Sequence, residues 1–419
     1  MAEHSRSPKT PAAVDRSEGF GERLLGTMID QAHEMPPHLI APLVAQVITD
    51  MGGRDITVYL QDYKQLTLVP LPGEGLVVGE PVPIEQSEIG RAFLSDGIVE
   101  QTDSGGGARL LVAMLDGTDR VGVLAFTKDT ADEDDRRLAR RFAGLLADVL
   151  VTKGMYTDRF FQARRQQPMS LAAEMQYSLL PPLMMTTSQI AIAGILEPAY
   201  AVAGDSFDYA LNDDVLQLAI IDAMGHGTNA AVMATVAIAA YRHARRADVS
   251  LSDLYASLDG AIADQFDAEH FVTVLMARLD VTDGQLRWVN AGHPPPLLWR
   301  SGRPVRALTA LSSLPAGFGG ADVLVNEEQL QPGDRVLFYT DGIIEERLHG
   351  GEEYGEDRLV EQFARAEEGG GTVQQTVRHL SEALLRGRDG QTSDDATLFL
   401  IEWRGGPPTD PASLDAEQG

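Results

Sequence analysis

VLQLAIIDAMGHG, residues 215–227, is the stretch that decides the fold of this chain. It joins an apolar, strand-like run to Asp222 and then to a turn that contains Gly225 and Gly227. An Ala-rich run with helical spacing follows at residues 228–245. The stretch therefore predicts a buried strand, a loop and a buried helix. Because Asp222 and the two glycines interrupt it, we do not interpret it as a membrane span.

Asp222 is one of several Asp residues in short segments that resemble strand ends. The segments are AGDSFD (203–208), IDAMGHG (221–227), FYTDG (338–342) and TSDDAT (392–397). Carboxylates at strand ends meet at a common rim, where they repel one another unless a cation neutralises them. Hard divalent ions such as Mg²⁺ or Mn²⁺ prefer oxygen ligands of this kind. The sequence therefore predicts a carboxylate-built, binuclear metal site.

Length, composition and net charge exclude several classes of protein and of partner. The 419 residues suggest two or three domains, and the absence of Cys excludes disulfides and thiolate metal sites. A formal net charge of −28 disfavours nucleic acid and anionic membranes as partners. Residues 1–17 lack the apolar core of a secretory signal. We expect a cytoplasmic protein with no nucleic-acid partner and no membrane partner.

The pattern along the chain predicts five segments. They are a disordered start (1–18), a first domain (19–152), a helical linker (153–187), a second domain (188–404) and a disordered tail (405–419). In the first domain we expect helices at 20–34 and 133–151, and hairpins that pair 56–60 with 65–69 and 109–114 with 120–127. This order of elements resembles an α/β GAF-like sensor domain. Its use for dimerisation and its use for binding a small molecule stay equally open.

The linker carries helical spacing from Phe160 to Leu180, and Pro181-Pro182 ends it. Such a helix could pair with its copy in a homodimer, or pack on its own catalytic domain. The sequence leaves both alternatives open.

In the second domain, the sequence pattern predicts many strands, with helices inserted between them in pairs. Expected strands are 189–195, 215–221, 272–279, 286–290, 296–299, 335–339 and 396–403, and expected helices are 228–245, 252–266, 357–366 and 372–386. Hairpin-length links predominate early, which favours stacked antiparallel sheets flanked by helices over an alternating βαβ fold. The expected fold class is α+β.

The five motifs AGDSFD, DAMGHG, NAGHPP (290–295), YTDG and SDDAT, in this order, resemble the bacterial PP2C-type (PPM) serine phosphatases. The SpoIIE/RsbU group is the most similar branch, and LAAEMQYSLLPP (171–182) also resembles the segment that precedes its catalytic domain. The resemblance implies an α-β-β-α sandwich for residues 188–404. It covers about half of the chain.

The resemblance also implies roles for individual residues. Asp222 would bridge two Mn²⁺ or Mg²⁺ ions, and the backbone carbonyl of Ala223 would complete one of them. Asp341 and Asp394 would hold the first metal, and Asp205 the second. Asp208 and Asp395 would act behind these ligands, orienting waters. Hydroxide formed from a water shared by the two metals would attack the phosphorus of a phosphorylated residue.

Some positions depart from the pattern of eukaryotic relatives. Met224 stands where those relatives carry a His that is a proposed general acid, and Tyr200 lies in the region of their phosphate-binding Arg. Protonation of the leaving group and binding of phosphate are therefore unassigned. For His293 we favour a structural role in a loop, and Gly225 and Gly227 are expected to permit a tight turn.

We therefore predict a metal-dependent protein serine/threonine phosphatase, regulated by its sensor domain. The resemblance implies a phosphorylated anti-sigma-factor antagonist of the STAS type as its substrate. Two alternatives stay open: a non-catalytic scaffold with a phosphatase fold, and a hydrolase of small phosphate esters. All four metal Asp residues are present, which weighs against the scaffold. The lack of a recognisable nucleotide-binding loop weighs against the second.

Overall fold

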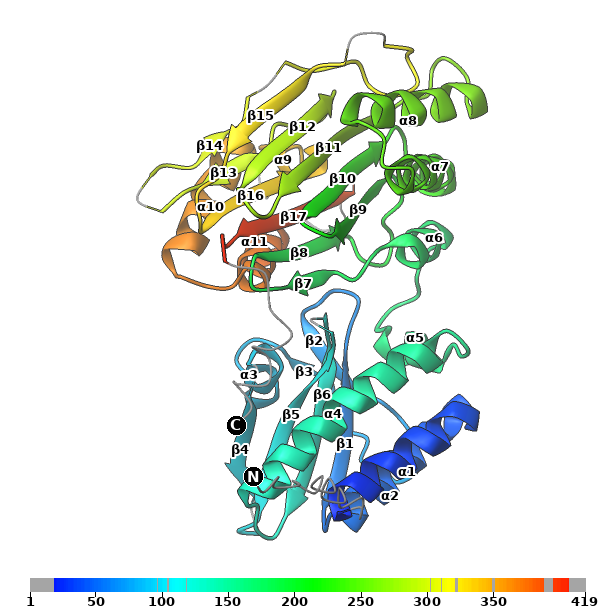
Figure 1. Ribbon diagram of the computed structural model, residues 1–419, viewed down its shortest axis with the longest axis vertical. Helices are drawn as coiled ribbons and strands as arrows, with labels where there is room; N and C mark the ends of the chain where they lie inside the picture. Colours follow the sequence, from blue (N-terminus) through cyan, green and yellow to red (C-terminus); the bar gives the residue numbers. More distant parts are fainter. Residues whose placement is uncertain are drawn as a thin grey trace, which may run out of the picture.

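The computed structural model describes residues 19–95, 97–103, 105–117, 119–301, 303–309, 311–320, 323–348, 351–387 and 395–406. The chain ends that the sequence predicts to be disordered lie outside this part, except for residues 405 and 406. Within it, no helix is both long enough and apolar enough to cross a membrane. Two domains lie one above the other, joined by a connector (Figure 1).

The N-terminal domain is built on an antiparallel sheet of six strands. In spatial order these are β3 (Val82–Pro83), β2 (Thr67–Pro70), β1 (Arg54–Gln61), β6 (Asp119–Lys128), β5 (Ala108–Asp116) and β4 (Ile98–Thr102). The helical elements are α1 (Phe20–Glu34), the 3₁₀ turn Pro37–Leu39, α2 (Ile40–Asp50), α3 (Glu88–Leu94) and α4 (Glu133–Gly154). Both predicted hairpins and both predicted helices are present, whereas α2 and α3 were not predicted. The main core lies between the sheet and α1, α2 and α4, and a smaller one lies under α3.

The connector differs from the single predicted helix. It forms two short helices, α5 (Arg159–Arg164) and α6 (Leu171–Leu179), with a break between them that contains Pro168. Proline lacks the backbone N–H of a continuous helix and disfavours helical geometry in the residue before it. Ser170 then caps α6 by accepting a hydrogen bond from the backbone N–H of Ala173. Helix α6 packs on the C-terminal domain of its own chain, where Ala172 is buried beside Ala230.

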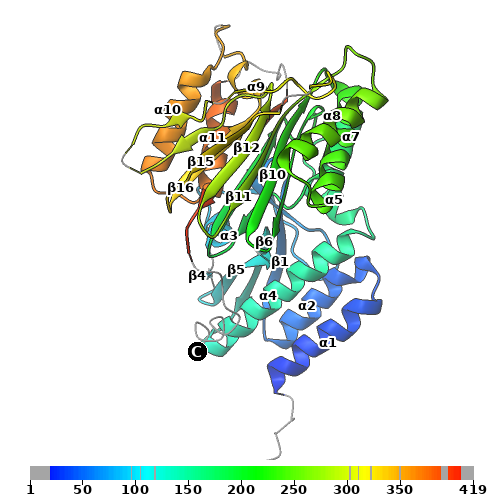
Figure 2. The ribbon, with the colours of Figure 1, turned by 45° about the horizontal axis from the view of Figure 1, so that its top comes forward.

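The C-terminal domain contains two antiparallel sheets. One is β15 (Val325–Gln329), β12 (Gln285–Ala291), β11 (Val272–Asp280), β10 (Val215–Ala223) and β9 (Asp205–Asn212); the other is β14 (Arg306–Ala307), β13 (Leu297–Trp299), β16 (Asp334–Tyr339), β17 (Ala396–Trp403), β8 (Ile190–Glu197) and β7 (Met184–Thr186). Its helices are α7 (Gly227–Arg246), α8 (Leu251–Gln265), α9 (Asp341–Ile344), α10 (Glu356–Glu368) and α11 (Val373–Gly387). The sheets face each other, with α7 and α8 outside one and α10 and α11 outside the other (Figure 2). The predicted α-β-β-α sandwich is confirmed.

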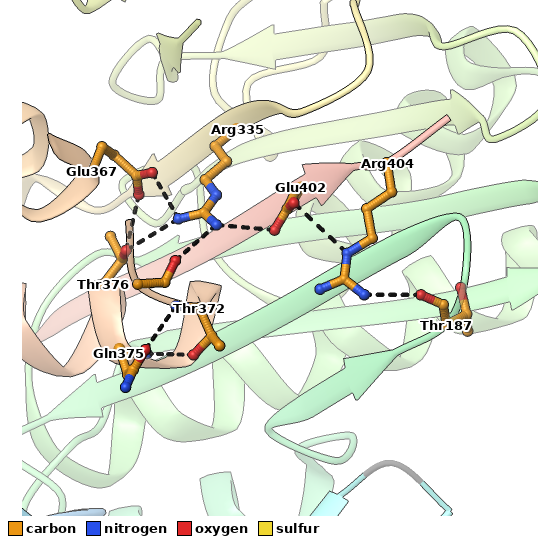
Figure 3. Close-up of polar contacts among 9 residues, drawn as sticks. Thr187, Arg335, Glu367, Thr372, Gln375, Thr376, Glu402 and Arg404 are labelled. Carbon is orange, nitrogen blue, oxygen red and sulfur yellow. Dashed lines mark hydrogen bonds and ion pairs between the residues drawn. The ribbon is translucent and has the colours of Figure 1, made fainter. Parts of the chain in front are cut away.

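Apolar side chains from both sheets fill the space between them. The rings of Phe207 on β9 and Phe399 on β17 lie 4.8 Å apart in this core. On the outer face of the second sheet, Arg335 of β16 pairs with Glu367 of α10 and Glu402 of β17, at 2.7 and 3.1 Å (Figure 3). Its guanidinium also donates to Thr376 of α11 at 3.4 Å. These contacts hold α10 and α11 on the outer face of the sheet.

Candidate metal centre

Asp205 and Asp222 face each other across two neighbouring strands. They are the last paired residues of the antiparallel β9–β10 ladder, at the end of β10 where the chain turns into α7. Asp205 is 1% exposed, and Asp222 is half-buried. Directly opposed residues of an antiparallel pair bring their side chains within about 5 Å of each other. The structure therefore places two predicted metal ligands side by side.

The second sheet closes around the Asp205 carboxylate. The hydroxyls of Thr340 and Thr397 both donate to Asp205 Oδ2, at 2.5 and 2.8 Å. Thr397 also donates its backbone N–H to Thr340 Oγ1 at 2.8 Å. All three residues are buried, and Asp341 follows Thr340 directly as the first residue of α9. These hydroxyls fix the orientation of one carboxylate and hold the start of α9, which carries Asp341, next to β9.

Asp395 supports the loop that leads into β9. Its Oδ2 accepts the backbone N–H groups of Ala203 and Gly204, at 2.6 and 2.7 Å. Its own backbone carbonyl lies against Gly342, where an added Cβ would approach to 1.8 Å. Asp395 thus ties the segment before Asp205 to the segment after Asp341. The water-orienting role of Asp395 stays a prediction, and the contact that the structure shows is with backbone amides.

The glycines of the motifs permit close backbone approaches. An added Cβ at Gly204 would lie 2.6 Å from the carbonyl oxygen of Ala223, the expected main-chain ligand. Gly225 and Gly227 adopt φ values of 98° and 71°, which side chains other than glycine rarely take. The tight turn predicted from these two glycines is present. It carries the chain from β10 into α7 within a few residues of Asp222.

The carboxylates of this cluster disfavour ionisation of one another. Burial, and after it the charges of Asp222 and Asp395, raise the pKa of Asp205 well above its ordinary value. The hydroxyls of Thr340 and Thr397 act in the opposite direction but do not outweigh burial. A divalent ion would reverse this balance by stabilising the ionised form. The donor types, carboxylates and a backbone carbonyl, are those that Mg²⁺ or Mn²⁺ prefers.

The cluster is incomplete within the described residues. Among them, no three His, Asp or Glu side chains lie close enough to enclose a metal ion. Asp394, the fourth expected ligand, lies outside the described part of the chain. The structure thus brings together Asp205, Asp222 and the segments that carry Asp341 and Asp395.

Asp208 lies elsewhere. It is three residues from Asp205 on the same strand, so its side chain faces the opposite side of the sheet. There it is 1% exposed and pairs with Arg242 and, at 3.4 Å, with Arg245 of α7. This contact replaces the water-orienting role that the sequence suggested, because the carboxylate points to α7 and not to the rim.

His293 holds the loop that follows β12. Its backbone N–H donates to Asn290 Oδ1 at 2.8 Å, the Asn290 amide donates to its carbonyl at 2.7 Å, and its Nδ1 lies 2.9 Å from Thr273 Oγ1. Burial lowers the pKa of His293 to about 3, so the imidazole is neutral near pH 7. These contacts agree with the structural role that we favoured.

Sequence reasoning missed Thr340, Thr397 and Gln176. Gln176 of α6 is fully buried and donates its amide to the carbonyl of Ala203 at 2.6 Å. A buried glutamine in the predicted helix carries no sequence signal for this contact. The two threonines do stand next to the YTDG and SDDAT aspartates, which was the available signal.

We expect the metal-free protein to lose stability as the pH rises, because Asp205 binds its proton more tightly when folded than when unfolded. The contribution of a group with a raised folded pKa is present at low pH and disappears as the pH rises through that pKa. Asp205→Asn stays neutral and keeps an oxygen for both threonines. In EDTA, the Tm of wild type minus that of Asp205→Asn should become more negative between pH 5 and 8. A difference that does not change with pH would contradict the electrostatic account.

Comparisons with known proteins show which family and which relatives this chain is similar to. Residues 212–404 match the family model described as Stage II sporulation protein E (SpoIIE). The chain is 24% identical over 264 residues to phosphoserine phosphatase RsbU of Bacillus subtilis, a match that covers 61% of this chain and 77% of RsbU. It is 24% identical over 192 residues to phosphoserine phosphatase RsbP of the same organism, covering 44% of this chain and 47% of RsbP. A crystal structure of the RsbU and RsbW domains of Rv1364c from Mycobacterium tuberculosis is 26% identical, with a TM-score of 0.49, and the match covers 57% of this chain and 69% of that one.

Proposed function

Since residues 212–404 belong to the SpoIIE family of PP2C-type phosphatases, we propose that this chain is a metal-dependent protein serine/threonine phosphatase. The observation that carries the proposal is the cross-strand pair of Asp205 and Asp222 at the rim of the sandwich. In this proposal, two Mn²⁺ or Mg²⁺ ions are held by Asp205, Asp222, the carbonyl of Ala223, Asp341 and Asp394. Family membership and the chemistry of the donor set support it.

Several residues of the chain would have separate roles in such a site. Divalent ions at this position supply a water with a lowered pKa and offset charge on the phosphoryl oxygens. Thr340 and Thr397 hold the Asp205 carboxylate in one orientation. Asp395 anchors the loop before Asp205. His293 is buried and holds the loop after β12, and burial lowers its pKa, which disfavours a role as general acid.

For the substrate we propose a phosphorylated protein, specifically an anti-sigma-factor antagonist of the STAS type. Two relatives named phosphoserine phosphatases, RsbU and RsbP, support a phosphoserine substrate. The GAF-like identity of the N-terminal domain and the formation of a homodimer remain predictions, because the family model covers neither.

The experiment measures phosphate release from a phosphoserine peptide, ATP and p-nitrophenyl phosphate, each with Mn²⁺ and with EDTA. We expect Mn²⁺-dependent release, with the peptide preferred over ATP. A preference for ATP would favour the hydrolase of small esters instead. Mn²⁺ binding without release from any of the three would favour the non-catalytic scaffold.

A further inference from the structure

The turn between β1 and β2, residues 62–66, inserts from the N-terminal domain into the catalytic domain. Tyr63 in this turn is 4% exposed and clusters with Ala199 and Tyr200. Its ring lies edge-on to Tyr177 of α6, with centroids 4.9 Å apart, and 6.4 Å from that of Tyr200. Figure 1 shows this turn directly below β7 and β8. The tip of an N-terminal hairpin thus forms part of the interior of the other domain.

Gln65 in the same turn has a backbone conformation that its residue type rarely adopts. Its φ is 57°, where glycine or asparagine would be usual. Its side-chain amide donates to the carbonyl of Gly194 on β8 at 3.0 Å, and its own carbonyl accepts from Arg378 Nε of α11 at 3.0 Å. Both bonds reach the catalytic domain. Contact between the domains therefore explains why glutamine occupies this position.

The connector, at the end of α5 and in the break that follows, also binds this turn. Gln166 donates its side-chain amide to Asp62 Oδ2 at 3.0 Å and its backbone N–H to the hydroxyl of Tyr200 at 2.9 Å. Arg164 Nε donates to the carbonyl of Gln61 at 2.8 Å. Residues 164–166 of the connector thus bind both the N-terminal hairpin and Tyr200 of the C-terminal domain.

The contacts continue from Tyr200 to the candidate metal centre. The carbonyl of Tyr200 accepts from the backbone N–H of Ser170, the cap of α6, at 2.9 Å. On the next part of α6, Gln176 donates to the carbonyl of Ala203. Ala203 stands two residues before Asp205, so segment 198–204 is held by Tyr63 and Ser170 at Tyr200, and by Gln176 and Asp395 at Ala203 and Gly204.

The contact between the β1–β2 turn and the C-terminal domain is not fully packed. A cleft of about 350 Å³ opens beside it, lined by Tyr63, Arg164 and Tyr177 among others, which leaves the turn room to shift. The Nη1 and Nη2 atoms of Arg378 are enclosed and have no hydrogen-bond partner within the described residues. A buried cation that is only partly hydrogen-bonded costs free energy, which weakens the docked state.

We propose that the β1–β2 turn positions the candidate metal centre: when Gln65 fixes the turn on β8 and α11, Tyr63 holds segment 198–204, and with it Asp205, in the metal-binding arrangement. The metal-binding part of this inference rests on the proposed function. Any movement of the N-terminal domain that withdraws the turn then lowers metal affinity. Tyr63 and Gln65 are positioning residues in this account, since Tyr63 acts through Tyr200 and Tyr177 of α6, and Gln65 acts by fixing the turn on β8 and α11.

The test uses the full chain and two readouts, calorimetric Mn²⁺ affinity and hydrogen–deuterium exchange of segment 198–204 without metal. Tyr63→Ala should weaken Mn²⁺ binding about tenfold, within the range expected for coupled sites, and should speed exchange in this segment. Tyr63→Phe keeps the ring contacts and should behave as wild type. Gln65→Gly relieves the positive φ, so it should fold while losing the bond to Gly194. Tyr156→Ala is the matched control, because Tyr156 is 72% exposed.

Exchange that rises only within residues 54–70, with unchanged Mn²⁺ affinity, would show a merely structural joint and overturn the inference. Wild type that binds no Mn²⁺ would instead overturn the proposed metal centre. In that case faster exchange of segment 198–204 in Tyr63→Ala would still support the positioning of the loop, and unchanged exchange would refute it. The two failures are therefore distinguishable.

Discussion

Asn in place of Asp222 lowers kcat/KM for Mn²⁺-dependent hydrolysis of a phosphoserine peptide by at least about a hundredfold. Asp222 is the expected bridge, and a neutral amide with a single acceptor oxygen cannot neutralise two cations. The substitution also removes one of the charges that raise the pKa of Asp205. The Tm of the variant in EDTA should therefore equal or exceed that of wild type, so the loss of activity is not a loss of fold.

Asp213→Asn is the matched control for this substitution. Asp213 is exposed in the turn between β9 and β10, and its φ of 49° is one that asparagine tolerates. It should retain wild-type activity and Mn²⁺ dependence. If Asp222→Asn kept more than about a tenth of the wild-type kcat/KM, well short of the loss expected for such a group, the bridging role would be refuted.

Asp208→Asn destabilises the catalytic domain by about 3 kcal/mol, because it leaves two arginines of α7 without their buried countercharge. For a domain of this size, the loss corresponds to a fall in Tm on the order of 10 °C. Asp208 itself is 1% exposed between β9 and α7, so water does not replace the missing charge easily. Thermal unfolding followed by circular dichroism measures the effect.

Mn²⁺ binding separates the two readings of Asp208. The ion-pair account predicts that Asp208→Asn, assayed below its Tm, binds Mn²⁺ with wild-type affinity. An unchanged Tm together with impaired Mn²⁺ binding would restore the water-orienting role. Asp205→Asn, on the same strand, should show the opposite pattern of preserved fold and lost metal affinity.

The elements with strong periodicity were predictable from the sequence. The apolar runs of β10, β11 and β17 and the Ala-rich α7 have lengths and spacings that local physics determines. Strand β9 was not predicted, because DSFDYALN mixes acidic and apolar residues in a way that resembles a loop. Once β9 is known, the spacing of three between Asp205 and Asp208 places them on opposite faces. The misassigned role of Asp208 follows from this one missing strand.

Contacts between distant segments could not be predicted. Thr340 and Thr397 reach Asp205 across 135 and 192 residues of sequence, and their approach depends on how the two sheets stack. The docking of Gln65 on Gly194 depends on the placement of whole domains. The periodicity of apolar residues shows which face of a single helix or strand is buried. It does not show which other element packs against that face.

The central claim is that these carboxylates form a metal centre, and calorimetric titration of Mn²⁺ into the metal-free full chain tests it most directly. The account predicts saturable binding to wild type, unchanged in Asp213→Asn and lost in Asp222→Asn. Equal binding to wild type and Asp222→Asn, or no saturable binding to wild type, would contradict it.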